Sequence, residues 1–167
     1  MEKTKFYEAS HSQVFDCLDD LGVTGMHMTS SSIALMGGKM KMEFLSPQKK
    51  GLHTVYRWRG KVLWMPMDFT VEVTHWEKGK VKVWETIGPA KMIIYSWFQM
   101  QLKVKQVMEG SLAELSICYR PPNNILGRVL CFMLGDWYCR WRIMHMLRDA
   151  EKSLTASDPQ RMARVVD

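Results

Sequence analysis

Short stretches in which polar and apolar residues alternate follow one another from about Met40 to Tyr119, and one amphipathic segment follows them. A period of two is typical of strands that bury one face. In the last segment the apolar residues recur at helical spacing and form one stripe, made of Cys139, Ile143, Met146, Leu147, Ala150 and Leu154. A sheet with one apolar face and a single helix with a matching stripe predict a sheet that curls around the helix, with a cavity between them.

The first residues predict a strand and a capped helix. Residues 3–8 are expected to form a strand, and Ser10 with Gln13 has the spacing of a capping box. The helix that follows is expected to bury Val14, Phe15, Leu18 and Leu21. Its acidic residues, Asp16, Asp19 and Asp20, are expected mostly to face water. A second short helical turn is expected at about residues 26–29.

The lysines set the expected orientation of the strands. If the lysine-bearing face of each strand lies in water, the opposite face lines the interior. That rule places polar and aromatic side chains inward beside the apolar ones: Tyr56, Trp58, Glu85, Ser96 and Tyr119. The other residues expected to contact a ligand are Met40, Met42, Phe98, Met100, Ile143 and Leu147. Residues 65–67, which have a proline at their centre, are expected to form a bulge or a corner.

Glu85 is the inward residue with the most reactive side chain in this scheme. A buried carboxylate is costly unless it is paired or protonated. An inward glutamate therefore suggests a general acid or base, or a group that orients the polar end of a ligand. The alternative interpretation places Glu85 at the mouth of the cavity, or turned outward by a bulge. Glu85 is the candidate catalytic residue, and no partner in catalysis is assigned.

Two further segments each have two interpretations. Residues 125–134, the most apolar stretch, are either a mobile flap at the cavity entrance or the first turns of the terminal helix. Asp136, after Gly135, is expected to cap a helix that restarts there. Tyr95 and Trp97 alternate away from the apolar set. They are expected to pack beneath the first helix, and a patch for a partner or a membrane is the alternative.

Composition argues against several classes of protein. The net charge of +6 is spread along the chain without a recognition motif, so no specific nucleic-acid partner is expected. The histidines are scattered and no cofactor motif is present, so neither a metal nor a cofactor is expected. The four cysteines lack paired spacing and are expected to be reduced. No apolar run approaches the roughly 20 residues that span a bilayer. We expect a cytoplasmic protein, and transient membrane contact stays open.

The order of elements resembles that of the START-like superfamily, also called SRPBCC or helix-grip. Local stretches are similar to strands of bacterial SRPBCC proteins labelled polyketide cyclase/dehydrase-like: residues 38–44 (GKMKMEF), 56–61 (YRWRGK), 71–74 (VEVT) and 83–88 (VWETIG). Residues 136–141 (DWYCRW), leading to 146–150 (MLRDA), resemble the start of their terminal helix. The resemblance covers residues 3–154. It implies an α+β fold in which a curved antiparallel sheet of about seven strands wraps a long C-terminal helix, with a short helix pair after the first strand. The domain would span residues 1–155, and 156–167 would form a tail.

The resemblance narrows function less than it narrows the fold, because one fold hosts many functions. The leading hypothesis is binding of a lipid-like or polycyclic hydrophobic small molecule in the cavity. The first alternative is a polyketide cyclase or aromatase that uses the same cavity. Its relatives rely on Arg, Tyr and Ser side chains, but Arg57 alternates outward here, which leaves Arg140 on the helix flank as the cationic candidate. The second alternative is a protein-interaction module of the co-chaperone type, with the outer sheet face as its docking surface.

Overall fold

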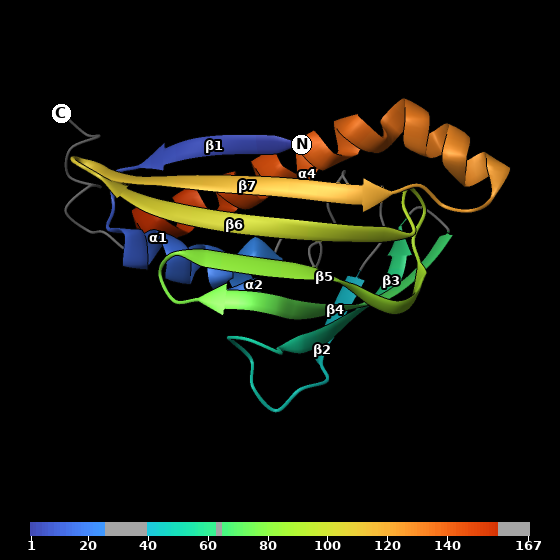
Figure 1. Cartoon of the computed structure of the whole chain (residues 1–167), viewed down its shortest axis with the longest axis horizontal. Helices are drawn as coiled ribbons and strands as arrows, with labels where there is room; N and C mark the ends of the chain where they lie inside the picture. The colour runs from blue at the N-terminus through green and yellow to red at the C-terminus, as the bar shows by residue number, and fades with distance from the viewer. Residues whose placement is uncertain (26–39, 63–64, 157–167) are drawn as a thin grey trace.

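One antiparallel sheet curls around a long helix, as the sequence predicted (Figure 1). The computed structural model describes residues 1–25, 40–62 and 65–156. The strands there are β1 (Glu2–Tyr7), β2 (Met40–Phe44), β3 (Val55–Val62), β4 (Met65–Glu77), β5 (Val81–Lys91), β6 (Trp97–Val107) and β7 (Gly110–Arg120). Their order across the sheet is β1-β7-β6-β5-β4-β3-β2. The helices of the same residues are α1 (His11–Asp19), α2 (Leu21–Thr24) and α4 (Ile125–Ala156).

The beginning of α1 is held by the predicted capping box. The Ser10 side chain accepts a hydrogen bond from the Gln13 backbone N–H at 3.3 Å, and the Gln13 side chain accepts one from the Ser10 N–H at 3.1 Å. The second helix, α2, follows immediately, and the Asp20 side chain caps it by accepting from the Gly22 N–H at 2.7 Å. The helical turn predicted at residues 26–29 lies outside the described residues.

The helix α4 is continuous from its cap to its end. Asn124 caps it, because its carbonyl accepts from the Arg128 N–H at 3.0 Å and its side chain accepts from the Gly127 N–H at 2.5 Å. The predicted restart with Asp136 as the cap is wrong: Asp136 lies inside α4 and accepts a hydrogen bond from the Tyr119 hydroxyl at 2.8 Å. Residues 125–134 therefore form the first turns of the helix, which was the second of the two interpretations.

Strand register explains where two predictions fail. Of the bulge or corner predicted at residues 65–67, the bulge is wrong, because β4 begins at Met65 and pairs regularly with the end of β3. The irregularities of pairing lie further along, at Asp68/Thr70 and Val73/His75. In β5 the buried residues are Lys82, Trp84 and Thr86, so the predicted inward face of this strand is its outer face.

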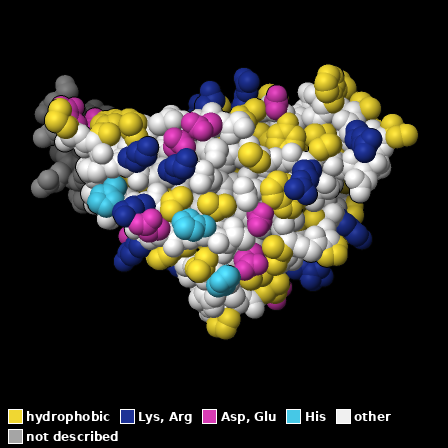
Figure 2. All heavy atoms as spheres, viewed as in Figure 1, with side chains coloured by type: hydrophobic (Ala, Val, Ile, Leu, Met, Phe, Trp, Pro, Cys, Tyr) yellow, Lys and Arg dark blue, Asp and Glu magenta, His cyan; other side chains and the backbone are white. Residues whose placement is uncertain are grey.

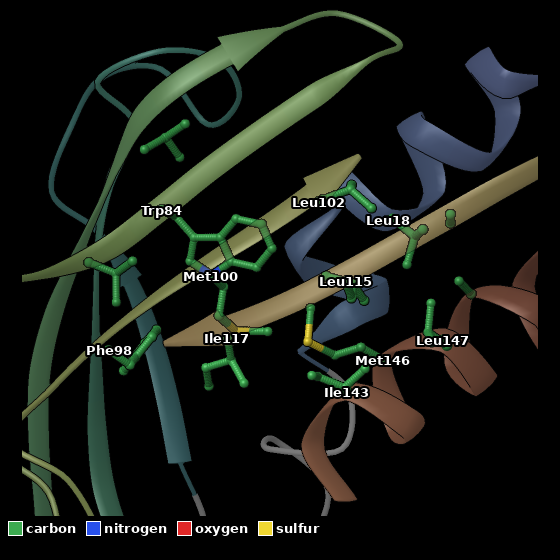
Figure 3. Close-up of a cluster of buried hydrophobic side chains, with 14 of the residues drawn as sticks. Leu18, Trp84, Phe98, Met100, Leu102, Leu115, Ile117, Ile143, Met146 and Leu147 are labelled. Atoms are coloured by element: carbon green, nitrogen blue, oxygen red, sulfur yellow. The ribbon is translucent and has the colours of Figure 1, made fainter. Parts of the chain in front are cut away.

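The core lies between the concave face of the sheet and the second half of α4 (Figure 3). Strand residues such as Phe98 and Met100 point toward Ile143 and Met146 of the helix, and Leu18 of α1 closes one side. The first half of α4, drawn in orange in Figure 1, lies beyond the end of β7. The second half of α4 therefore packs against the concave face of the sheet, and the first half extends past the sheet (Figure 1).

Candidate functional site

An arginine lies in the middle of the apolar interior. Arg142 of α4 is only 7% exposed. Its guanidinium is 4.7 Å from the centre of the Phe98 ring and donates a hydrogen bond to the Tyr95 hydroxyl at 3.3 Å. Its Nε is buried without a hydrogen-bond partner. Within the described part of the chain, no carboxylate forms an ion pair with this buried cation.

Tyrosines surround the guanidinium. Tyr95 and Tyr138 lie with their ring centres 5.9 Å apart, and Tyr56 is also buried beside the same space. Burial raises the pKa of all three tyrosines, so their hydroxyls stay protonated and can donate hydrogen bonds at neutral pH. Tyr95 was predicted on the opposite face, under the first helix; it lies in the core against α4 instead. The interior thus offers one cation and several hydroxyl donors.

A second buried cation is neutralised by the protein itself. The Lys82 ammonium lies 2.6 Å from an Asp19 carboxylate oxygen, and both side chains are almost fully buried. Burial lowers the pKa of Lys82, and the charge of Asp19 acts in the opposite direction. Asp19 also accepts a hydrogen bond from the Trp76 indole at 3.3 Å. The prediction that Asp19 faces water is therefore wrong, because Lys82 draws it into the core.

Two small cavities lie beside Arg142 among the described residues. One cavity of about 30 Å³ lies among Met67, Phe69, Tyr95, Tyr138 and Arg142. Another of about 20 Å³ lies on the Tyr56 and Trp58 side of the same guanidinium. Each has room for about one water molecule. Neither of these two cavities is large enough to be the spacious interior cavity that the sequence predicted, which stays a prediction.

A larger open cleft lies at the end of the molecule where α4 begins. It has a volume of about 570 Å³, which is within the range of small-molecule sites. Its walls are mostly apolar: Met65, Pro66, Ala90, Met92, Ile93, Leu126 and Leu130. Met92 and Ile93 line both this cleft and the inner cavity beside Arg142. The segment that joins β5 to β6 is therefore the wall between the open cleft and the buried guanidinium.

The predicted ligand-contacting residues lie in different places. Those on the inner surface, buried or half-buried, are Met40, Met42, Tyr56, Trp58, Phe98, Met100, Ile143 and Leu147. Ser96 lines the cleft, and its hydroxyl donates to the Pro121 carbonyl at 3.0 Å. Tyr119 is half-buried, and its hydroxyl donates to Asp136 of α4. Glu85 is on the outer face of β5 and accepts a hydrogen bond from the Gln99 side chain at 3.3 Å. The prediction that Glu85 points inward is therefore wrong. Contact of the other residues with a ligand stays a prediction.

Arg142 was not among the candidate site residues predicted from the sequence, although its helical spacing indicates a buried position. Arg142 is three residues after Cys139 and four before Met146, so it belongs to the apolar stripe by position. Arg140, the predicted cationic candidate, is exposed. The described residues contain no cluster of His, Cys, Asp and Glu that can hold a metal ion. None of the described helices combines the length and the apolar character that crossing a bilayer requires.

Solved structures resemble this arrangement along nearly its whole length. No family model matches the sequence, and no curated protein matches it. The protein TTHA0849 from Thermus thermophilus superposes with a TM-score of 0.69 at 14% identity, over 95% of this chain and 98% of that one. The Zhui aromatase/cyclase from Streptomyces sp. R1128 gives 0.66 at 12% identity, over 96% of both chains. Norcoclaurine synthase from Thalictrum flavum gives 0.65 at 11% identity, over 95% and 87%.

The chain has the START-like, helix-grip fold. Its seven-stranded sheet, short helix pair and long terminal helix are the parts of that fold. At sequence identities this low, the shared fold does not indicate which reaction, if any, the protein catalyses, because proteins with unrelated activities share one architecture. The chemistry of this protein must therefore be argued from its own side chains around Arg142.

Proposed function

We propose that the protein binds a mostly apolar small molecule that has an acidic or carbonyl group at one end. The apolar body would occupy the cleft, and the polar end would reach Arg142 after Met92 and Ile93 move aside. Structures of the same fold support a ligand-binding role, since the norcoclaurine synthase is in complex with dopamine and hydroxybenzaldehyde. This proposal narrows the lipid-like or polycyclic ligand expected from the sequence to one with a hydrogen-bond acceptor.

The buried guanidinium of Arg142 is the observation that supports this ligand class best. A charge removed from water costs several kcal/mol unless an opposite charge and hydrogen bonds replace the water. Among the described residues, Arg142 has one hydroxyl partner, one aromatic ring and an unpartnered Nε. A ligand carboxylate or carbonyl would supply the missing acceptor, and the apolar walls of the cleft would favour an apolar body.

The small volume beside Arg142 makes the proposal specific. About 30 Å³ cannot hold a ring system or an acyl chain, so the polar group alone would enter the inner cavity. The wall at Met92 and Ile93 belongs to the connection between β5 and β6, outside the regular strands. Such a connection can change conformation without breaking the hydrogen bonds of the sheet.

A fluorescent fatty acid tests the proposal directly. The probes are cis-parinaric acid and its methyl ester, which differ in whether the end of the chain carries a negative charge. The unaltered protein is expected to bind the acid, and Arg142→Met is expected to weaken that binding by about tenfold or more. The ester should be much less sensitive to the substitution.

Arg140→Met is the matched control, because it removes a charge from the exposed surface of the same helix. It should leave the affinity for the acid unchanged. Failure of the unaltered protein to bind the acid, or equal losses in the two variants, contradicts the proposal. Circular dichroism of each variant verifies that the fold is intact.

A cyclase-type enzyme is the second candidate. Arg142 and the hydroxyls of Tyr56, Tyr95 and Tyr138 are donors that can stabilise an enolate oxygen away from water. Glu85 no longer supports it, because that carboxylate lies on the outer face. Tyr95→Phe distinguishes the two candidates: loss of turnover with unchanged ligand binding favours the enzyme, whereas an equal effect on both favours binding alone.

A further inference from the structure

The first half of α4 exposes a continuous row of large apolar side chains. Ile125, Val129, Met133 and Trp137 follow one another at four-residue spacing and therefore lie on one face. Exposed fractions reach 83% for Ile125, 62% for Trp137 and 94% for the neighbouring Phe132. We call the exposed set the apolar ridge; it consists of Ile125, Leu126, Val129, Phe132, Met133 and Trp137.

The apolar ridge needs an explanation because proteins rarely leave such a set in water. Contiguous exposed apolar patches mark surfaces that contact proteins or membranes. Figure 2 shows hydrophobic side chains gathered at the end of the molecule where Figure 1 places the first half of α4. The inner side of this half-helix is narrow: its buried residues are Gly127, Cys131 and Gly135. The large side chains are therefore on the outside, where they do not contribute to the core.

The charges around the apolar ridge have one dominant sign. From Arg120 to Arg148 the sequence has four exposed arginines besides the buried Arg142, and a single acidic residue, Asp136. Arg128 and Arg140 are exposed on α4 itself, and Asp136 is engaged by the Tyr119 hydroxyl. Lys91 lies at the adjoining cleft. The surface that complements this end of the molecule is therefore apolar and negatively charged.

We propose that the apolar ridge docks on the surface of a bilayer that contains anionic lipids. A helix with Trp, Phe, Leu and Ile on one face and arginines beside them has the composition of helices that lie in the membrane interface. Tryptophan favours that depth because its ring is apolar and its N–H is polar. The half of α4 that carries the ridge extends past the end of the sheet, where a flat bilayer can reach it (Figure 1). A protein partner is the alternative that the experiment below tests.

The cleft gives membrane docking a consequence. Leu126 belongs both to the apolar ridge and to the wall of the cleft, so a docked ridge places the cleft opening against the lipid. An apolar molecule can then pass between bilayer and cleft without crossing water. Docking itself does not depend on the ligand proposed above, so either proposal can fail while the other stands.

Vesicle flotation tests the docking surface. The chain is mixed with vesicles of phosphatidylcholine alone, or of phosphatidylcholine with phosphatidylglycerol. It is expected to float with the mixed vesicles, to float poorly with the neutral ones, and to detach as salt is raised. Phe132→Ser combined with Trp137→Ser is expected to weaken binding to the mixed vesicles by about tenfold or more.

Two matched controls use exposed side chains outside the ridge. Met108→Ser removes a fully exposed apolar side chain between β6 and β7 and should not change flotation. Arg128→Gln with Arg140→Gln should remove the preference for anionic lipid, whereas Lys49→Gln with Lys78→Gln, an equal loss of exposed charge, should keep it. Absence of flotation by the unaltered chain overturns the proposal. So does a ridge variant that floats like the unaltered chain, or a dimer in light scattering that this variant converts to monomer.

Discussion

Lys82 and Arg142 are both buried cations, and they differ in what balances their charge. Lys82 has Asp19 at 2.6 Å, so its charge is neutralised within the fold. Arg142 has the Tyr95 hydroxyl and the face of Phe98, which are weaker substitutes for an anion. The first pair has a structural role in joining α1 to β5. The burial of Arg142 costs the ligand-free protein more free energy than the burial of the Lys82–Asp19 pair. We therefore assign ligand binding to Arg142.

Removing one member of the buried ion pair should destabilise the protein strongly. In Asp19→Asn the Trp76 indole keeps an acceptor, but the buried Lys82 ammonium loses its counter-charge. The free energy of unfolding is expected to fall by about 3–5 kcal/mol in urea titrations. Adding Lys82→Met to Asp19→Asn should recover most of that loss, because the unpaired charge is then gone. Asp16→Asn, on the exposed side of the same helix, is the control, and an equal effect there contradicts the assignment.

At the scale of elements, α4 combines two environments in one unbroken helix. Its second half supplies the apolar stripe that the sheet encloses. Its first half lies close to Pro122 and to Tyr119 of β7, and glycines allow this approach. A Cβ at Gly127 would lie 2.8 Å from the Pro122 ring, and one at Gly135 would lie 3.0 Å from the Tyr119 hydroxyl. The small inner residues let this half-helix lie near the end of β7 while its large side chains stay outside.

The position of the helix cap leads to a prediction for α4. The Asn124 side chain accepts from the Gly127 N–H at the start of the helix, whereas the Arg128 N–H donates to the Asn124 backbone carbonyl, which alanine also provides. Asn124→Ala should therefore lower stability by about 1 kcal/mol and speed hydrogen exchange in the first turns of α4. Asn123→Ala, the exposed neighbour, should change neither quantity. Faster exchange throughout α4, rather than in its first turns, would contradict a local capping role.

Local periodicity predicted most elements but not the register of every strand. The capping box at Ser10, the inward faces of β3 and β6 and the apolar stripe of α4 all follow from neighbouring residues. In β5 both faces carry apolar residues, so the assumption that Lys82 faces water decided the register. A shift by one residue exchanges the two faces of a strand, and this exchange turned Glu85 inward.

The errors in the candidate site have the same physical origin. Asp19, Lys82 and Arg142 are all charged residues that the fold buries. Whether a charge can be buried depends on its partner from another element, and such pairs are invisible to periodicity within one segment. The Lys82–Asp19 pair joins residues 63 positions apart, as measured by the hydrogen bond between them. The sequence therefore predicts the walls of the START-like interior better than its polar contents.

For the whole molecule, the distribution of the five tyrosines gives a test of how the interior is closed. Burial raises the pKa of Tyr7, Tyr56, Tyr95, Tyr119 and Tyr138, which are all the tyrosines of the chain. They come from β1, β3, β7, α4 and the connection between β5 and β6. A titration that follows all five therefore reports on the packing of sheet against helix as a unit.

The sign of the pH dependence follows from these raised values. A tyrosine in the unfolded chain loses its proton near its ordinary pKa of about 10, whereas the folded protein still holds it. The stabilisation is complete below that pH and is lost as the pH rises above it, because the unfolded state then binds fewer protons. We expect no tyrosinate absorbance from the folded protein near pH 10. Ionisation should instead appear together with the loss of circular dichroism at higher pH. Tyr119→Phe, which removes one of the five tyrosines, should lower the final absorbance by one-fifth and leave the coincidence of the two signals intact. An absorbance step with unchanged circular dichroism would instead mean that at least one tyrosine is open to water in the folded state.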